Sequence, residues 1–214
     1  MLKYPLLFYF MLLVEGSVTG WALFRWKNST YGQKFIILLL TGIFIVEILE
    51  LWMAAQNIRN FWLIDLATLG ECLILLSIFR NWKTSVRDKK IILVSGIAFV
   101  IIWVVAKWTF EPFNQMNIYT STVARIIEIS FAISILFDVL KDSHSSLKGD
   151  IRLWVSSAVI IYATGSLLLF ALFVVMLKES PSVVKAIWPV NWVLMIVYYL
   201  LYARSISCRV PQKK

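Results

Sequence analysis

Four carboxylates of this chain lie at positions where a membrane protein would meet hydrocarbon. Glu15, Glu47, Glu71 and Glu128 each fall near the middle of a separate apolar run of roughly twenty residues, which is long enough to span a bilayer. A charged side chain at that depth costs roughly 2.5–3.5 kcal/mol of insertion free energy. Four of them at one depth predict a shared polar chamber that binds a ligand, an ion or a proton.

Five more polar residues extend this candidate ligand-binding site. They are Glu50, Asp65, Arg125, Tyr162 and Asn191. Glu50 lies one helical turn from Glu47, so we expect the two to share a helix face. Arg125 and Glu128 are three residues apart and share a face in the same way. Most of the set falls in the middle and outer half of the predicted spans, so a chamber there would open toward the exterior.

The charges of this set are unbalanced. Six acids face one intramembrane base, Arg125, with Lys107 near the outer rim. Because they cannot all be ionised in a low-dielectric interior, we expect some to carry a proton at neutral pH. The alternative is a purely structural role in which each acid hydrogen-bonds to a neighbouring helix. Such bonds average only about 0.6 kcal/mol in membrane proteins, which is little beside the insertion cost.

The elements that must hold these residues are seven apolar helices joined by short polar connections. Composition agrees, since 60% of the residues are hydrophobic and 15% are charged, against about 45–50% and 25% in soluble domains. We predict one all-α domain over residues 1–214, a seven-transmembrane helix bundle. The expected helices are Tyr4–Phe24, Phe35–Ala55, Phe61–Phe79, Ile91–Trp108, Tyr119–Leu140, Leu153–Leu177 and Ala186–Ile206.

Lysine and arginine predict the orientation of this bundle. Fifteen of them fall on one side of the predicted spans and five on the other, with Arg125 inside a span. The basic side is expected to be cytoplasmic, which places the N-terminus outside and the C-terminus inside. The net charge of +9 does not indicate nucleic acid, because the basic residues lie in the connections rather than on one face.

Several chemistries find no support in the sequence. The one histidine, His144, lies in a loop, and the two cysteines lie in a span and in the C-terminal tail. Metal ligation by several imidazoles is therefore not expected. No phosphate-binding Gly-Lys-Ser/Thr loop is present, and the last predicted helix has no mid-span lysine that could hold retinal. We expect no catalytic residues, no metal and no cofactor.

The chain resembles a family of uncharacterised seven-helix proteins of the bacterial inner membrane. The resemblance rests on IVEILELW (45–52), LGECLILLSIFRNWK (69–83), RIIEISFAISILF (125–137), RLWVSSAVIIYATGSLLLFALF (152–173) and Asn191. It implies a multi-pass protein of the bacterial plasma membrane with no assigned chemistry. It also implies that the recurring polar or small positions are Glu47, Glu71, Glu128, Tyr162, Gly165 and Asn191.

Three functions stay open at this point. The first is a receptor or sensor whose outward-facing acidic pocket takes a small molecule or cation, read by a signalling partner at the basic cytoplasmic face. The second is a transporter for a small solute or cation, coupled to protons through the carboxylates; few of the broken helices and repeats typical of transporters are seen. The third is an intramembrane lipid-modifying enzyme using paired acids, although no nucleophile with a base partner is evident.

Overall fold

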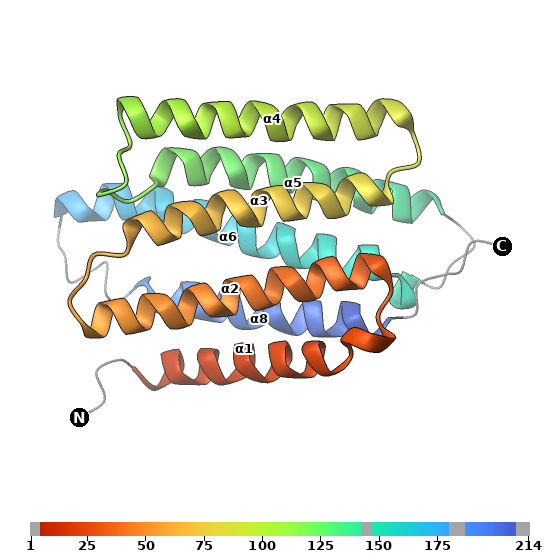
Figure 1. The fold of residues 1–214 in the computed structure, drawn as a ribbon, viewed down its shortest axis with the longest axis horizontal. Coiled ribbons are helices and arrows are strands. Elements are labelled where there is room, and N and C mark those ends of the chain that lie inside the picture. Colours follow the sequence, from red (N-terminus) through yellow and green to blue (C-terminus); the bar gives the residue numbers. More distant parts are fainter. Residues whose placement is uncertain (1–4, 143–146, 180–186, 209–214) are drawn as a thin grey trace. The chain divides into compact units, whose positions relative to one another are not determined.

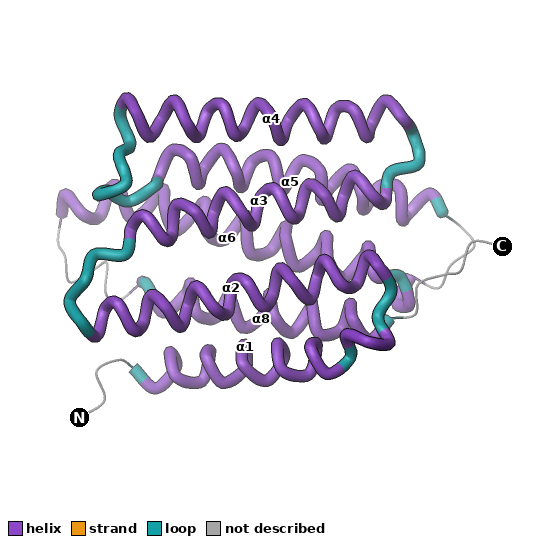
Figure 2. The backbone as a smooth tube through the Cα atoms, in the orientation of Figure 1, coloured by secondary structure: helices purple, strands orange, loops and turns teal. Residues whose placement is uncertain are grey.

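A computed structural model describes residues 5–142, 147–179 and 187–208 of the chain. Within these residues all regular structure is helical (Figures 1 and 2). The seven predicted helices are confirmed as helices, most of them longer by a few residues than expected. The α-helices are α1 (Leu6–Phe24), α2 (Tyr31–Ala55), α3 (Phe61–Trp82), α4 (Val86–Thr109), α5 (Ile118–Lys141), α6 (Ile151–Glu179) and α8 (Pro189–Ser207).

Six of these helices are long and apolar enough to cross a membrane: α1, α2, α3, α4, α6 over Ile151–Leu172, and α8. The protein is therefore a helical, multi-pass membrane protein. The helix outside this group is α5, which carries Arg125 and Glu128.

Capping residues explain where several helices begin and end. Thr30 and Gln33 form a capping box at the start of α2, in which the Thr30 amide donates to Gln33 Oε1 at 2.9 Å. After α2 the chain turns through Asn57, whose φ of 57° lies in the left-handed region. The amide of Ile58 donates to Met53 O at 2.9 Å, closing a Schellman turn.

The chain divides into two compact units, of which the first is Thr30–Phe131. It contains α2, α3, α4 and the first part of α5. Helix α3 packs against α2 and against α4 (Figure 1). Most of the sequence-predicted charged residues lie in this unit.

The second unit comprises Met1–Ser29 and Ala132–Lys214. In it α8 packs against α1 and α6. Tyr198, Tyr199 and Tyr202 of α8 are fully buried, and Tyr162 of α6 stacks on Tyr198 with ring centroids 4.8 Å apart. At Gly165 the side chain of Leu194 packs directly on α6, since an added Cβ would lie 2.5 Å from Cδ1 of Leu194.

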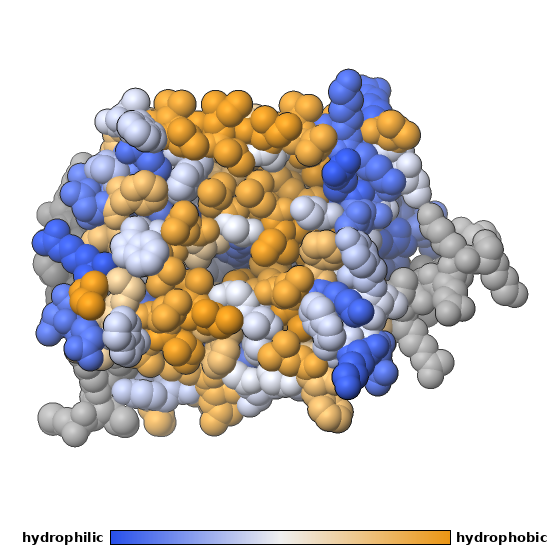
Figure 3. All heavy atoms as spheres, viewed as in Figure 1, coloured by the Kyte–Doolittle hydropathy of each residue, from blue (hydrophilic) through white to orange (hydrophobic). Residues whose placement is uncertain are grey.

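Helix α4 shows the surface expected of a lipid-facing helix. Its exposed side chains include the apolar row Ile91, Val94, Ile97, Ile101 and Val105, spaced three or four residues apart. Figure 3 shows apolar side chains along this helix and hydrophilic ones near the end where it begins. Arg87, Lys89 and Lys90 lie at that end, where charged side chains reach the polar interface.

Candidate functional site

A shared guanidinium joins two carboxylates in the middle of α3 and α5. Arg125 Nη2 donates to Glu71 Oε2 at 2.8 Å, and its Nη1 donates to Glu128 Oε2, also at 2.8 Å. We call these three residues the Arg125 cluster. Sequence reasoning expected Arg125 and Glu128 to share a helix face, and their ion pair confirms it.

The cluster is almost entirely removed from solvent within the protein. The side chains of Arg125, Glu71 and Glu128 are 7%, 10% and 1% exposed. Glu71 comes from α3 and the other two from α5, so one hydrogen bond of the cluster joins two helices and the other stays within one. Cys72, the next residue of α3, is fully buried. Its thiol lies within electrostatic range of Glu71, Arg125 and Glu128.

The Arg125 cluster has one base for two acids, so its formal charge is −1 when all three groups are ionised. Buried charges are stable only when paired and hydrogen-bonded. Oε1 of Glu128 is buried and accepts no hydrogen bond from a described residue. Oε1 of Glu128 therefore offers an acceptor for a proton or a bound cation, in a group of three residues whose formal charge is −1.

A second acid–base–acid group lies where α3 begins and α4 ends. Lys107 Nζ donates to Asp65 Oδ1 at 2.7 Å and to Glu111 Oε2 at 3.4 Å. We call these residues the Lys107 cluster; all three are buried. Lys107 is thus a buried ion-pair partner, which its expected place near the rim did not predict.

The Lys107 cluster differs from the Arg125 cluster in what compensates its surplus charge. Glu111 Oε1 accepts from the amide of Tyr119 at 2.7 Å, and Oε2 accepts from the amide of Thr120 at 3.2 Å. These amides belong to the first turn of α5, where the helix dipole favours a negative charge. Glu111 is therefore satisfied by the fold itself, whereas Oδ2 of Asp65 is buried and accepts no hydrogen bond from a described residue.

Polar side chains lie between the two clusters along one side of α3. Asp65, Thr68 and Cys72 are buried and spaced as neighbours on one helix face. Thr68 accepts a hydrogen bond from Asn117 Nδ2 at 3.0 Å. This contact joins α3 to the start of α5, at a depth between Asp65 and Glu71.

Two expected site residues of the same unit stand apart from these clusters. Glu47 and Glu50 of α2 are half-buried and form no hydrogen bond or ion pair with a described residue. They are near enough to repel each other, as their spacing predicts. An added Cβ at Gly42 of α2 or Gly70 of α3 would meet open space, and Figure 3 shows the surface hollowed between these two helices.

The remaining expected residues belong to the second unit. Glu15 is fully buried on the face of α1 that also carries Met11, Val18 and Ala22. Tyr162 takes part in the aromatic packing of α6 on α8. Asn191 is half-buried near the start of α8.

Sequence reasoning missed Glu111, Thr68, Asn117 and Thr120. Glu111 lies in the connection before α5, and an acid shortly before a helix start is a capping signal. Asn117 directly precedes α5, where asparagine is a favoured N-cap residue, but nothing in the sequence signals its contact with Thr68. Thr68 and Thr120 carry no signal that distinguishes them from ordinary helix residues. Among the described residues, no three His, Cys, Asp or Glu side chains are grouped as a metal site.

Comparison with known protein families, with curated proteins and with solved structures found no match to this chain.

Proposed function

We propose that this protein is a receptor-like sensor in which the Arg125 cluster takes up a proton or a small cation that arrives from the outer side. One observation carries the proposal: a single buried guanidinium is shared by two buried carboxylates from two helices. Such a cluster has one negative charge in surplus, and intramembrane ionisable groups mark ligand and proton sites by default.

The proposal includes seven spans in the bacterial plasma membrane, with the N-terminus outside and the C-terminus in the cytoplasm. Helix α5 is the seventh span. It has 24 residues, about 36 Å at 1.5 Å per residue, and its two central charges neutralise one another. The excess of lysine and arginine on one side supports the orientation.

The geometry supports a switch with two states. The bond from Arg125 to Glu128 lies within α5, whereas the bond to Glu71 holds α5 against α3. A cation at Glu71 competes with Arg125 and removes the bond between the helices, while the bond within α5 persists. Because α5 is one continuous helix, the displacement is carried along it toward Lys141, where a cytoplasmic partner can detect it.

Uninterrupted helices favour a sensor over a transporter. Helices α2, α3, α4 and α5 run for 25, 22, 24 and 24 residues without a break. Transporters bind substrate at discontinuous helices in the membrane midplane. Nothing comparable occurs in α3 or α5 at the depth of Glu71 and Arg125.

Proton-coupled transport is the second candidate, and the polar row on α3 favours it. Asp65 and Thr68 share one face of the helix, and Glu71 follows one turn further along on a neighbouring face; each is bonded to a polar partner. A proton or cation could follow these groups. Proteoliposome uptake that survives Glu47→Gln combined with Glu71→Gln would exclude a carboxylate-coupled transport mechanism.

Spin labels can test the sensor proposal. Ser77 of α3 and Ser130 of α5 are exposed, so each can be replaced by a labelled cysteine. In reconstituted protein we expect their separation to change when the pH falls or when tetramethylammonium is added. The Glu71→Gln variant keeps a hydrogen-bond acceptor for Arg125 but removes the surplus charge, so its separation should not respond.

Asp88→Asn provides the matched control, because it removes a carboxylate from the first turn of α4, remote from the cluster. It should respond as the unmodified protein does. An equal response in Glu71→Gln, or no response of the unmodified protein to either probe, would refute the proposal.

A further inference from the structure

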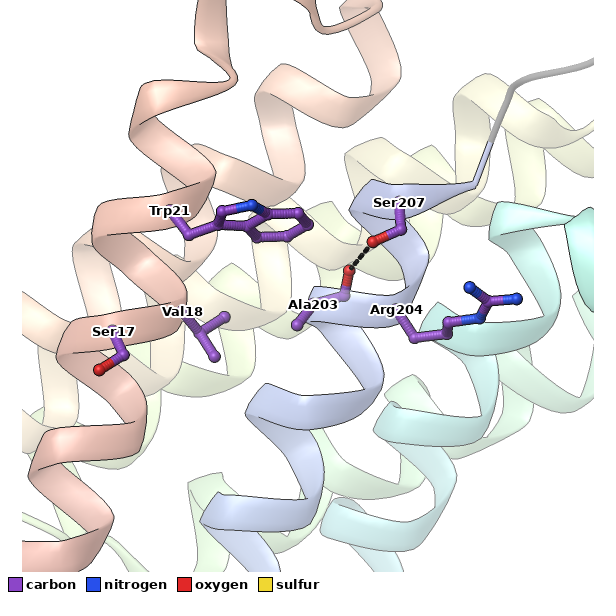
Figure 4. Close-up of a pocket in the computed structure, with 6 residues that line it drawn as sticks. All are labelled: Ser17, Val18, Trp21, Ala203, Arg204 and Ser207. Atoms are coloured by element: carbon purple, nitrogen blue, oxygen red, sulfur yellow. Dashed lines mark hydrogen bonds between the residues drawn. The ribbon is translucent and has the colours of Figure 1, made fainter.

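The second unit contains a pocket that lies apart from the charged clusters. Its volume is about 420 Å³. It is formed by the C-terminal halves of α1 and α8, which pack against each other (Figure 4). Its lining residues are Ser17, Val18, Trp21, Ala203, Arg204 and Ser207. Since both helices end beside it, the pocket lies near the membrane surface.

The pocket has a cationic edge with unused hydrogen-bond donors. Arg204 is exposed, and its guanidinium stacks over the ring of Trp154 at 5.6 Å. The guanidinium forms no hydrogen bond or ion pair with a described residue, whereas the backbone oxygen of Arg204 accepts from Cys208 Sγ at 3.3 Å. Arg25, at the end of α1, stacks over Trp21 at 5.2 Å. Among the described residues that line the pocket none is acidic, and Arg204 is the one that carries a charge.

The rest of the lining is apolar or carries a hydroxyl. Val18, Ala203 and the Trp21 ring form the apolar part, as Figure 4 shows. Ser207 Oγ donates to the backbone oxygen of Ala203 at 3.1 Å and can still accept a hydrogen bond. A tryptophan at the end of a span marks the headgroup level of the bilayer. Figure 4 shows the Arg204 side chain extending from α8 away from Trp21 and toward α6, so its guanidinium lies at the outer edge of the pocket. A cationic edge beyond an apolar wall at that level fits a molecule with an anionic head and a hydrocarbon chain.

We propose that this pocket binds one anionic phospholipid. Arg204 binds the phosphate, for which its planar fork of N–H donors is suited. The serine hydroxyls face the polar glycerol region, and the first methylenes of an acyl chain lie against Val18 and Trp21. Charge complementarity selects an anionic lipid over a zwitterionic one. The proposal does not depend on the Arg125 cluster or on the direction of the chain in the membrane.

Native mass spectrometry of the detergent-purified protein can test this site. Phosphatidylglycerol and phosphatidylcholine with identical chains are titrated separately, and inorganic phosphate in a third series. We expect phosphatidylglycerol to bind more tightly than phosphatidylcholine. Arg204→Gln should weaken its binding about five- to tenfold, as loss of one basic contact predicts. Arg204→Lys should retain most of the preference, because it keeps the charge.

Arg80→Gln is the matched control, since it removes an exposed arginine from the last turn of α3. It should leave phosphatidylglycerol binding unchanged. A second variant, Trp21→Ala, should weaken the binding of both lipids, because it removes part of the apolar wall. The proposal is overturned if Arg80→Gln has the same effect as Arg204→Gln, if both lipids bind equally, or if phosphate alone competes away the lipid.

Discussion

An arginine suits the position between Glu71 and Glu128 better than a lysine would. Its Nη1 and Nη2 atoms donate to two different carboxylates at once, each at 2.8 Å. A lysine ammonium is a compact point charge without this planar fork. In the Lys107 cluster the contact to Asp65 is 2.7 Å, whereas the contact to Glu111 is longer, at 3.4 Å. The arginine thus holds both acids at the same distance.

Removing the guanidinium should be costly. We expect Arg125→Gln to lower the free energy of unfolding by about 3–5 kcal/mol, because it leaves two buried carboxylates unpaired. Arg125→Lys should lower the free energy of unfolding by less, since one of the two hydrogen bonds can persist. Denaturant titration in mixed micelles measures both variants.

The matching control replaces all three residues by apolar ones, as Glu71→Leu, Arg125→Met and Glu128→Leu. Replacing a buried ion network by packed apolar side chains is often neutral or stabilising by about 1–4 kcal/mol. We therefore expect a folded protein that no longer responds to protons or cations. A response that survives in this triple variant would show that the cluster is not the site.

At this scale the sequence predicts contacts within a helix and misses contacts between helices. The spacing of Arg125 and Glu128 was enough to predict that they share a helix face, on which the structure pairs them. The partner of Glu71 lies 54 residues away and that of Asp65 lies 42 residues away. Which helix faces which depends on packing over whole helix surfaces, and periodicity alone does not specify it.

Among the helices, α5 depends most on a residue outside itself. Glu111 accepts from the amides of Tyr119 and Thr120 and bonds Lys107 of α4. We expect Glu111→Ala to cost about 0.5–2 kcal/mol through loss of the helix cap. Hydrogen exchange of the Tyr119 and Thr120 amides should become faster. Asp88→Ala at the start of α4 should leave the exchange rates of those two amides unchanged. If Glu111→Ala also leaves them unchanged, Glu111 does not cap α5.

The crossing of α6 and α8 offers a second test at this scale. Gly165→Ala would place a methyl group 2.5 Å from Cδ1 and 2.7 Å from Cδ2 of Leu194. Overpacking of this kind costs about 1–3 kcal/mol, so the melting temperature should fall. Gly42→Ala, which meets open space in α2, should not lower it. Equal melting temperatures for the two variants would contradict the close crossing.

The helices themselves were predictable because each needs only a long apolar run between polar connections. The grouping of their polar residues was not. Four acids at one depth indicated a common chamber, and the structure joins two of the four through one guanidinium. Glu15 belongs to the second unit, Glu47 lies beside Glu50, and Glu71 and Glu128 share Arg125. Depth along a helix is readable from sequence, but rotation about its axis is much less so.

For the whole molecule, seven spans with opposite termini can be tested by reporter fusions. A fluorescent protein that matures only in the cytoplasm should fluoresce when fused after Lys214 and remain dark when fused before Met1. Alkaline phosphatase, which is active only outside, should give the reverse pattern. The same result at both termini would mean an even number of spans, with α5 not crossing.

The central claim is that the Arg125 cluster takes up one positive charge. Infrared difference spectroscopy of the protein in nanodiscs, recorded while the pH is lowered, measures this directly through the carboxyl C=O stretch. We predict a carboxyl band that changes in the unmodified protein and in Asp88→Asn, and that is absent from the Glu71→Gln/Glu128→Gln double variant. Identical spectra of the unmodified protein and the double variant at every pH would contradict the claim.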